Sequence, residues 1–169
     1  MIPYVYSVLG PHAGQSVEEI FRTKQRQILT HGYCYWLQKS YEAKPEMFKD
    51  FTKEQMGVCF FLEATRKGKA ARPTTTAQEA CKFSSDKTLW EDIPVGIGPT
   101  GKLPAYALVL NSISYFKEPT WIDPKVRFML GKSTILAEPQ ITSNNNLDGK
   151  GRKVVAVATL IYPFCVHVK

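Results

Sequence analysis

Two glycine-rich segments have spacings that nucleotide-binding loops use. Residues 96–102 (Gly-Ile-Gly-Pro-Thr-Gly-Lys) match the Gly-x-x-x-x-Gly-Lys pattern, in which backbone amides cradle phosphates and the Lys contacts them. A working loop continues into a helix, but here Leu103 and Pro104 follow, and Pro104 opposes helix at that point. Residues 131–134 (Gly-Lys-Ser-Thr) have the correct ending, but Val126 stands where the first Gly belongs. Neither segment therefore predicts a nucleoside-triphosphate site.

Carboxylate, thiol and imidazole side chains form no complete catalytic pattern. Residues 42–44 (Glu-Ala-Lys) have the spacing of metal-dependent nucleases, but the nearest upstream acid is Glu19, inside a predicted helix. The chain has no Cys-x-x-Cys pair and no close His pair, so no metal or cofactor is expected. If the chain is an enzyme, its acid-base groups would be carboxylates beside apolar strands, paired with a Lys: Glu63, Asp92 and Asp123. We favour a non-catalytic role and keep this small-molecule enzyme as the alternative.

Basic side chains are the next candidate chemistry. The sequence has 22 Lys and Arg against 15 Asp and Glu, a net charge of +7, and such a surface attracts phosphate backbones. One cluster follows the apolar run 58–64, and another lies on the first predicted helix. Together they are our candidate phosphate-binding residues: Arg66, Lys67, Lys69, Arg72, Arg22, Lys24 and Arg26. A merely solvated, solubilising face is the alternative for both clusters.

Tryptophans supply the surface on which an unpaired base could stack. Base stacking on an aromatic ring contributes roughly 1–3 kcal/mol. Trp90 and Trp121 lie next to predicted loops, whereas Trp36 lies in an apolar strand, where a core position is the alternative. Cations and aromatic rings together favour binding of DNA or RNA. A protein-interaction domain that presents an aromatic patch is a third possibility.

Residues 35–42 (Tyr-Trp-Leu-Gln-Lys-Ser-Tyr-Glu) resemble the opening signature of EVE domains, a family of the PUA-like superfamily. The family motif is Trp-Leu-x-Lys-Ser-Glu-Pro on its first strand, and its matching positions here are Trp36, Leu37, Lys39, Ser40 and Glu42. Tyr41 interrupts the motif, and the Pro is displaced to Pro45. Residues 119–124 are similar to an Asp-Pro stretch after a central EVE strand. The resemblance implies a pocket for one nucleic-acid base, often a modified one, and makes Trp36, Lys39 and Ser40 ligand-binding candidates.

Alternating and continuous apolar runs predict the elements that position these residues. The best-defined element is a helix over 17–31, because Ser16 and Glu19 form a capping box and Gly32 suits the C′ position. Strands are predicted over 4–9, 33–37, 58–64, 105–116 and 154–168, the last one bent at Pro163. We also predict a short helix or turn within 43–55, a helix over 77–83, a loop over 90–102 and a turn over 119–123.

The order of elements predicts an α+β fold. We expect a strongly curved mixed β-sheet, or a small PUA-like β-barrel with flanking helices, formed by residues 1–169 as one domain. No run of about 18 apolar residues occurs, and the N-terminus does not read as a signal peptide. The four cysteines are predicted to be free thiols in a reducing compartment. These features predict an intracellular protein, cytoplasmic, or nuclear in a eukaryote, with no membrane partner.

Overall fold

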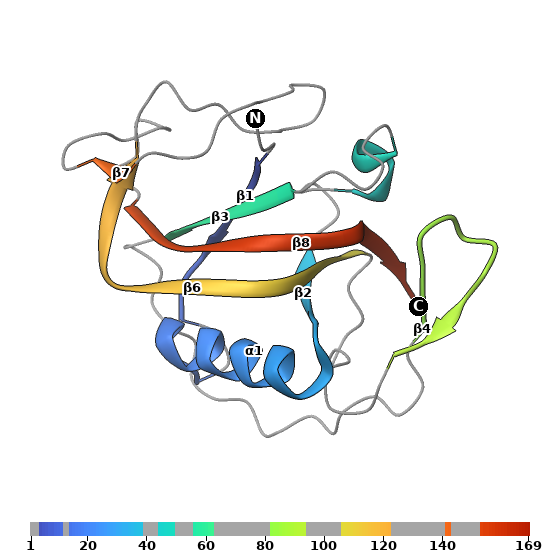
Figure 1. Cartoon of the computed structure of the whole chain (residues 1–169), viewed down its shortest axis with the longest axis horizontal. Coiled ribbons are helices and arrows are strands. Elements are labelled where there is room, and N and C mark those ends of the chain that lie inside the picture. The colour runs from blue at the N-terminus through green and yellow to red at the C-terminus, as the bar shows by residue number, and fades with distance from the viewer. Residues whose placement is uncertain are drawn as a thin grey trace.

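The computed structural model describes residues 4–11, 14–38, 44–49, 56–62, 82–93, 106–122, 141–142 and 153–169. Within these ranges the chain forms, in order, β1 (Tyr4–Leu9), α1 (Val17–His31), β2 (Cys34–Gln38), the 3₁₀ helix η1 (Pro45–Phe48), β3 (Met56–Leu62), β4 (Lys82–Ser84), β5 (Glu91–Asp92), β6 (Tyr106–Ile122), β7 (Ile141–Thr142) and β8 (Lys153–Val168). The strands β3, β8 and β6 run side by side across the molecule, and α1 lies next to β6 (Figure 1).

Helix α1 begins and ends where its local sequence directs. The Ser16 hydroxyl accepts from the backbone N–H of Glu19 at 3.1 Å, and the Glu19 carboxylate accepts from the backbone N–H of Ser16 at 2.8 Å. Gly32 ends the helix with a φ of 85°, and its N–H donates to the carbonyl of Ile28 at 2.7 Å. A residue without a Cβ adopts this left-handed conformation at little cost. The helix buries Phe21 against the sheet and leaves much of its other side exposed.

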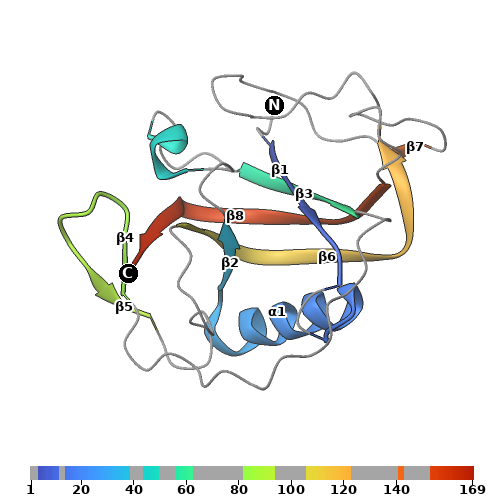
Figure 2. The same ribbon diagram turned by 180° about the vertical axis from the view of Figure 1, so that it is seen from behind.

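The sheet is mixed and mostly antiparallel. Its single parallel pairing among the described strands joins β1 to β3, while β3 with β8, β8 with β6 and β6 with β2 are all antiparallel. Strand β8 is central: β3 and β6 flank its first part, and beyond Pro163 it pairs with β6 and β4. Strand β6 turns sharply toward β7, whereas β4 and β5 lie beside the opposite end of β8 (Figures 1 and 2).

The core has two sides because several strands are buried on both faces. Phe21, Trp36 and Phe60 form the centre of the larger side, where α1 covers the sheet. On the other side Tyr35 packs with neighbours from β6 and β8. Residues of β3 therefore alternate between two apolar environments, and the strand is buried from Met56 to Phe61. This explains its unbroken apolar sequence.

Most predicted elements are confirmed. The α+β class is confirmed, and the capped helix α1 and the first strand β1 occur where expected. The long strands β6 and β8 also occur at their predicted positions. The structure has one α-helix in its described part, where several flanking helices were expected, and η1 corresponds to the short helix or turn predicted within 43–55. Pairings among the described strands leave the sheet open, so closure into a barrel is not shown.

Two predicted elements, one helix and one turn, are wrong. The predicted helix over 77–83 is replaced at its end by β4, because the backbone N–H and carbonyl of Lys82 both hydrogen-bond Lys169, at 2.8 and 3.0 Å. The rest of that prediction, 77–81, lies outside the described residues. The predicted turn over 119–123 is instead strand up to Ile122, because β6 continues to pair with β7. The predicted loop over 90–102 contains the two-residue strand β5.

Candidate nucleic-acid interface

The loop between β4 and β5 is organised by its own polar side chains. The Ser84 hydroxyl accepts from the backbone N–H groups of Asp86 and Lys87, at 3.3 and 2.9 Å, and donates to Asp86 Oδ1 at 3.1 Å. Asp86 Oδ1 also accepts from the backbone N–H groups of Thr88 and Leu89, at 2.8 and 3.2 Å. Hydrogen bonds from the Thr88 side chain and from these backbone amides hold the pKa of Asp86 well below its usual range. The loop is therefore a preformed turn.

Trp90 follows this turn and is partly exposed. Its indole N–H donates to the carbonyl of Lys87 at 3.2 Å, and the ammonium of Lys169 lies 4.1 Å from the centroid of its ring. Lys169 and Lys82 exchange two backbone hydrogen bonds, which places their side chains on one face of the sheet. Lys82 also forms an exposed ion pair with Asp92 at 3.5 Å. An aromatic ring with a cation over one face thus lies at this end of the sheet.

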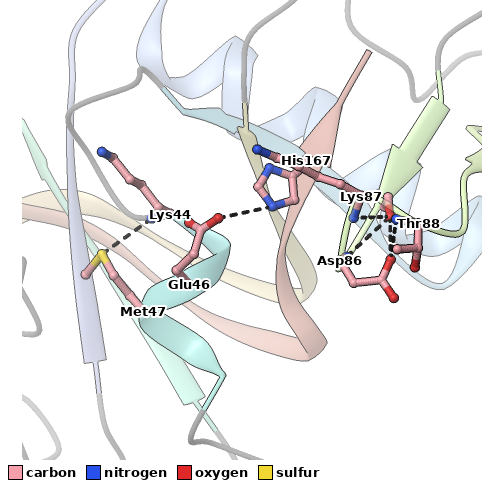
Figure 3. Close-up of polar contacts among 8 residues, drawn as sticks. Lys44, Glu46, Met47, Asp86, Lys87, Thr88 and His167 are labelled. Carbon is pink, nitrogen blue, oxygen red and sulfur yellow. Dashed lines mark hydrogen bonds and ion pairs between the residues drawn. The ribbon is translucent and has the colours of Figure 1, made fainter.

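His167 lies between this loop and η1 (Figure 3). Its side chain is buried, with Nε2 3.4 Å from Glu46 Oε1 and its ring meeting the Tyr106 ring edge-on at 5.6 Å. Burial lowers the pKa of His167, the carboxylates of Glu46 and Asp86 act to raise it, and the Lys87 ammonium acts to lower it. Because the pKa lies below the ordinary value of 6.5, His167 is neutral at pH 7.

Cys165, His167 and Glu46 have the residue types of a nucleophilic centre, but their environment opposes that chemistry. The Cys165 side chain is buried, and both burial and the Glu46 carboxylate raise the pKa of its thiol far above the usual value. A catalytic cysteine needs the opposite, a lowered pKa and access to substrate. Cys165 is therefore a packing residue of the core.

The structure corrects the interpretation of Trp36 as a base-binding residue. Trp36 is 9% exposed, and its ring stacks on Phe21 with centroids 5.4 Å apart and an interplanar angle of 18°. The ring of Phe60 packs against it at 4.4 Å. A base cannot stack on a ring that these two side chains already cover. Trp36 therefore lies in the core, the position predicted from the sequence as the alternative to base stacking.

Lys24 is also not placed to bind phosphate. Although it lies on α1 among charged neighbours in sequence, its ammonium donates to the backbone carbonyl of Tyr35 on β2 at 2.7 Å. Burial lowers the pKa of Lys24, and the neighbouring Cys34 offsets part of that effect. The cation is directed into the protein and satisfies a strand carbonyl, which corrects its predicted role.

Arg22 and Arg26 remain on the exposed side of α1 and border a groove of about 720 Å³. Arg22 forms an ion pair with Glu18 at 2.7 Å, and Arg26 donates to the Thr23 hydroxyl at 3.3 Å. Glu18 and Glu19 balance the two arginines on this exposed surface. The helix therefore has no excess positive charge there, and its electrostatic attraction for phosphate is weak.

Several predicted site residues cannot be placed. Those that lie outside the described residues are Lys39, Ser40, Arg66, Lys67, Lys69, Arg72, Glu63 and Asp123. Trp121 belongs to β6, where its backbone pairs with Thr142 of β7. Asp92, the remaining carboxylate of the enzyme alternative, has an 85% exposed side chain paired with Lys82. This is an ordinary surface carboxylate.

Three cations of the candidate interface were missed in the sequence: Lys82, Lys87 and Lys169. Lys82 and Lys87 lie within eight residues of Trp90, so their local density was a usable signal, but the predicted helix over 77–83 concealed it. Lys169 comes from the far end of the printed sequence. Only pairing of β4 with β8 brings it to Trp90, and no local pattern predicts that pairing.

No protein-family model, curated protein or solved structure matches the chain significantly. The resemblance to EVE domains therefore stays a prediction. Within the described ranges, no group of three His, Cys, Asp or Glu side chains could hold a metal ion. The same part of the chain contains no helix with the length and apolar character needed to span a membrane.

Proposed function

We propose that the chain is a non-catalytic nucleic-acid-binding protein whose contact surface is centred on Trp90. The observation that carries this proposal is the partly exposed indole ring, which donates a hydrogen bond to Lys87 and has the Lys169 ammonium over one face, 4.1 Å from its centroid. A base would stack on the other face of the ring. Bases stack on such rings, and cations beside them bind the phosphates that follow. Lys82, on the same sheet face as Lys169, extends the positive surface.

The position of the lysines and the rigidity of the turn support this location. The described residues include ten Lys or Arg and seven Asp or Glu, and the exposed surface of α1 contributes no excess. Lys82, Lys87 and Lys169 lie around Trp90, and Asp86, Glu91 and Asp92 of the same segment carry as many negative charges. The support therefore comes from the position of the lysines beside the aromatic ring and not from an excess of charge. The turn that carries Trp90 is fixed by hydrogen bonds to Ser84 and Asp86, so little conformational entropy is lost when a base binds.

The finer parts of the proposal extend it beyond the described residues. We retain the PUA-like relationship as part of this hypothesis, with Lys39 and Ser40 near a base that can be modified, Trp121 as a second stacking residue, and the basic segment 66–72 as a further phosphate contact. Cys34 and Cys59 are free and buried, which favours a reducing compartment such as the cytoplasm or a nucleus.

The test is binding of fluorescent single- and double-stranded DNA and RNA, followed by anisotropy from low to physiological salt. Each lost phosphate contact reduces the log–log salt slope by about 0.7 for single strands and about 0.9 for duplex. We expect the triple variant K82A/K87A/K169A to bind more weakly and to lower that slope by about 2–3. Trp90→Ala should lower affinity about 5- to 150-fold and leave the slope unchanged, because stacking contributes roughly 1–3 kcal/mol and releases no counterions.

The matched control is the double variant R22A/R26A, which removes two exposed cations from α1. We expect it to bind like the wild type, because Arg22 and Arg26 belong to α1 and are not part of the contact surface proposed around Trp90. Absence of binding to all four nucleic acids at low salt would refute the proposed function. If binding occurs but the lysine variant keeps both affinity and slope, the contact surface lies elsewhere, and a variant with Arg66, Lys67, Lys69 and Arg72 changed to Ala tests the segment 66–72.

A further inference from the structure

Within the part of the chain that the structure describes, the segment 82–92, comprising β4, the preformed turn and β5, is attached to the sheet mainly through the end of β8. We call it the strap. Phe83 pairs with Val168 and Ser84 pairs with His167, and beyond them Lys82 and Lys169 exchange two backbone hydrogen bonds. The Phe83 ring also packs on Tyr35 at 5.6 Å. With so few contacts, the strap can open at low cost compared with the long strands of the sheet.

His167 lies at the centre of this attachment. It pairs through its backbone with Ser84, the residue whose hydroxyl organises the turn, while its imidazole lies in a buried position. Among the described residues, the groups that face it are Glu46 on η1 and Asp86 and Lys87 on the turn (Figure 3). The ring of Tyr106 on β6 also contacts it. Along its own segment the nearest titratable groups are the thiol of Cys165 and the ammonium of Lys169, each two residues away.

A charged imidazolium would be poorly solvated in this position. Among the described residues, only Glu46, at 3.4 Å, is within ion-pair distance, and the Glu46 side chain is itself 61% exposed, so its attraction is screened by water. Lys87 opposes the charge of Asp86 on the turn. Opening the strap would remove β4 from one side of His167 and admit water. Protonation and strap opening should therefore favour one another.

We propose that His167 is an acid-sensitive latch, whose protonation releases the strap from β8. The neutral imidazole is compatible with the closed strap at pH 7. In mild acid the proton binds more strongly to the open form, in which water solvates the ring. Opening displaces Trp90, which follows the turn, from Lys169, which follows β8. The device thus separates the aromatic ring from the cation beside it.

The pH window follows from proton linkage. Because burial lowers the pKa of His167 in the closed form, the open form binds the proton first as pH falls below about 6.5. The closed form then loses stability until pH falls below its own lowered pKa, where both forms are protonated. Within this window the opening equilibrium constant rises by at most about tenfold for each pH unit.

Amide hydrogen exchange of the nucleic-acid-free protein tests the latch. The reporters are the N–H groups of Lys82 and Lys169, which bond across the attachment, and the reference is the N–H of Gly32, which bonds within α1. After correction for intrinsic exchange rates, we expect the opening constant at the reporters to rise up to about tenfold from pH 7.5 to 5.5. The reference should change by less than about twofold.

Two variants separate the latch from general acid sensitivity. His167→Gln should abolish the pH response at the reporters, whereas His31→Gln, which changes an exposed histidine on α1, should retain it. Glu46→Gln should deepen the response, because it removes a carboxylate that favours the closed, protonated form. Equal opening at both pH values in the wild type, or an unchanged response in folded His167→Gln, overturns the latch.

If His167→Gln does not fold, NMR titration of the wild-type His167 ring decides the question. A ring pKa clearly below 6.5 supports the latch, and a pKa at or above 6.5 overturns it. Acid-dependent release of nucleic acid is a consequence that rests on the proposed function. The exchange experiment contains no nucleic acid, so loss of the proposed function would leave its result unaffected, and failure of the latch would leave binding at pH 7 unaffected.

Discussion

Replacement of Trp36 by Ala tests whether this residue stabilises the core by packing or binds a nucleic-acid base by stacking. A buried Trp covers about 150–250 Å², which at roughly 25 cal/mol per Å² corresponds to about 4–6 kcal/mol. Large-to-small changes of this kind usually cost about 3–5 kcal/mol. Trp36 is 9% exposed and contacts both Phe21 and Phe60, so we expect a loss near that range. For a chain of this size the melting temperature should fall by about 6–20 °C.

The assay is thermal and urea unfolding followed by circular dichroism, with nucleic-acid affinity measured on the folded fraction at low temperature. Trp90→Ala is the matched control, because Trp90 is partly exposed, and its removal should change stability by at most about 1 kcal/mol. If Trp36→Ala keeps wild-type stability yet loses nucleic-acid affinity, the core assignment is wrong and Trp36 is a ligand-binding residue after all.

Two further predictions concern the helix cap and the buried thiols. Ser16→Ala should lower the free energy of unfolding by about 1 kcal/mol, because the N–H of Glu19 loses its acceptor, and Ser16→Asp should restore most of the loss in the same unfolding assay. Burial raises the pKa of Cys34 to about 11 and of Cys59 to about 12, so these thiols should resist iodoacetamide at pH 8 in the native protein and react after denaturation. Native-state alkylation of either one, detected by mass spectrometry, would contradict the burial described above.

Local chemistry made the helix and the long strands predictable. Ser16, Glu19 and Gly32 act within one or two turns of α1, so the sequence alone contains both ends of that helix. The apolar run of β3 is likewise informative, because a short continuous apolar run is typical of a strand covered on both faces. In these cases the signal and the contact that it reflects lie within a few residues.

Pairing between distant segments was not predictable in the same way. Residues 77–83 have helical spacing, but Lys82 and Phe83 gain strand partners from the end of β8. The direction of the Lys24 side chain also depends on β2, because its ammonium donates to the Tyr35 carbonyl. The charged sequence around Lys24 on α1 does not indicate this inward direction. Trp90 and Lys169 are separated by 78 residues in sequence, so their contact has no local signature.

The central place of β8 has a consequence for how the chain is made. Strand β3 is apolar on both faces and pairs with β1 on one edge and β8 on the other. At a synthesis rate of about 5–20 residues per second, β8 follows β3 by roughly 5–20 s. During that interval an apolar strand has an unpaired edge, which is a site for chaperone binding or aggregation. Completion of residues 153–168 supplies a neighbour to β3, β6 and β4, so the sheet should assemble in one late, cooperative step.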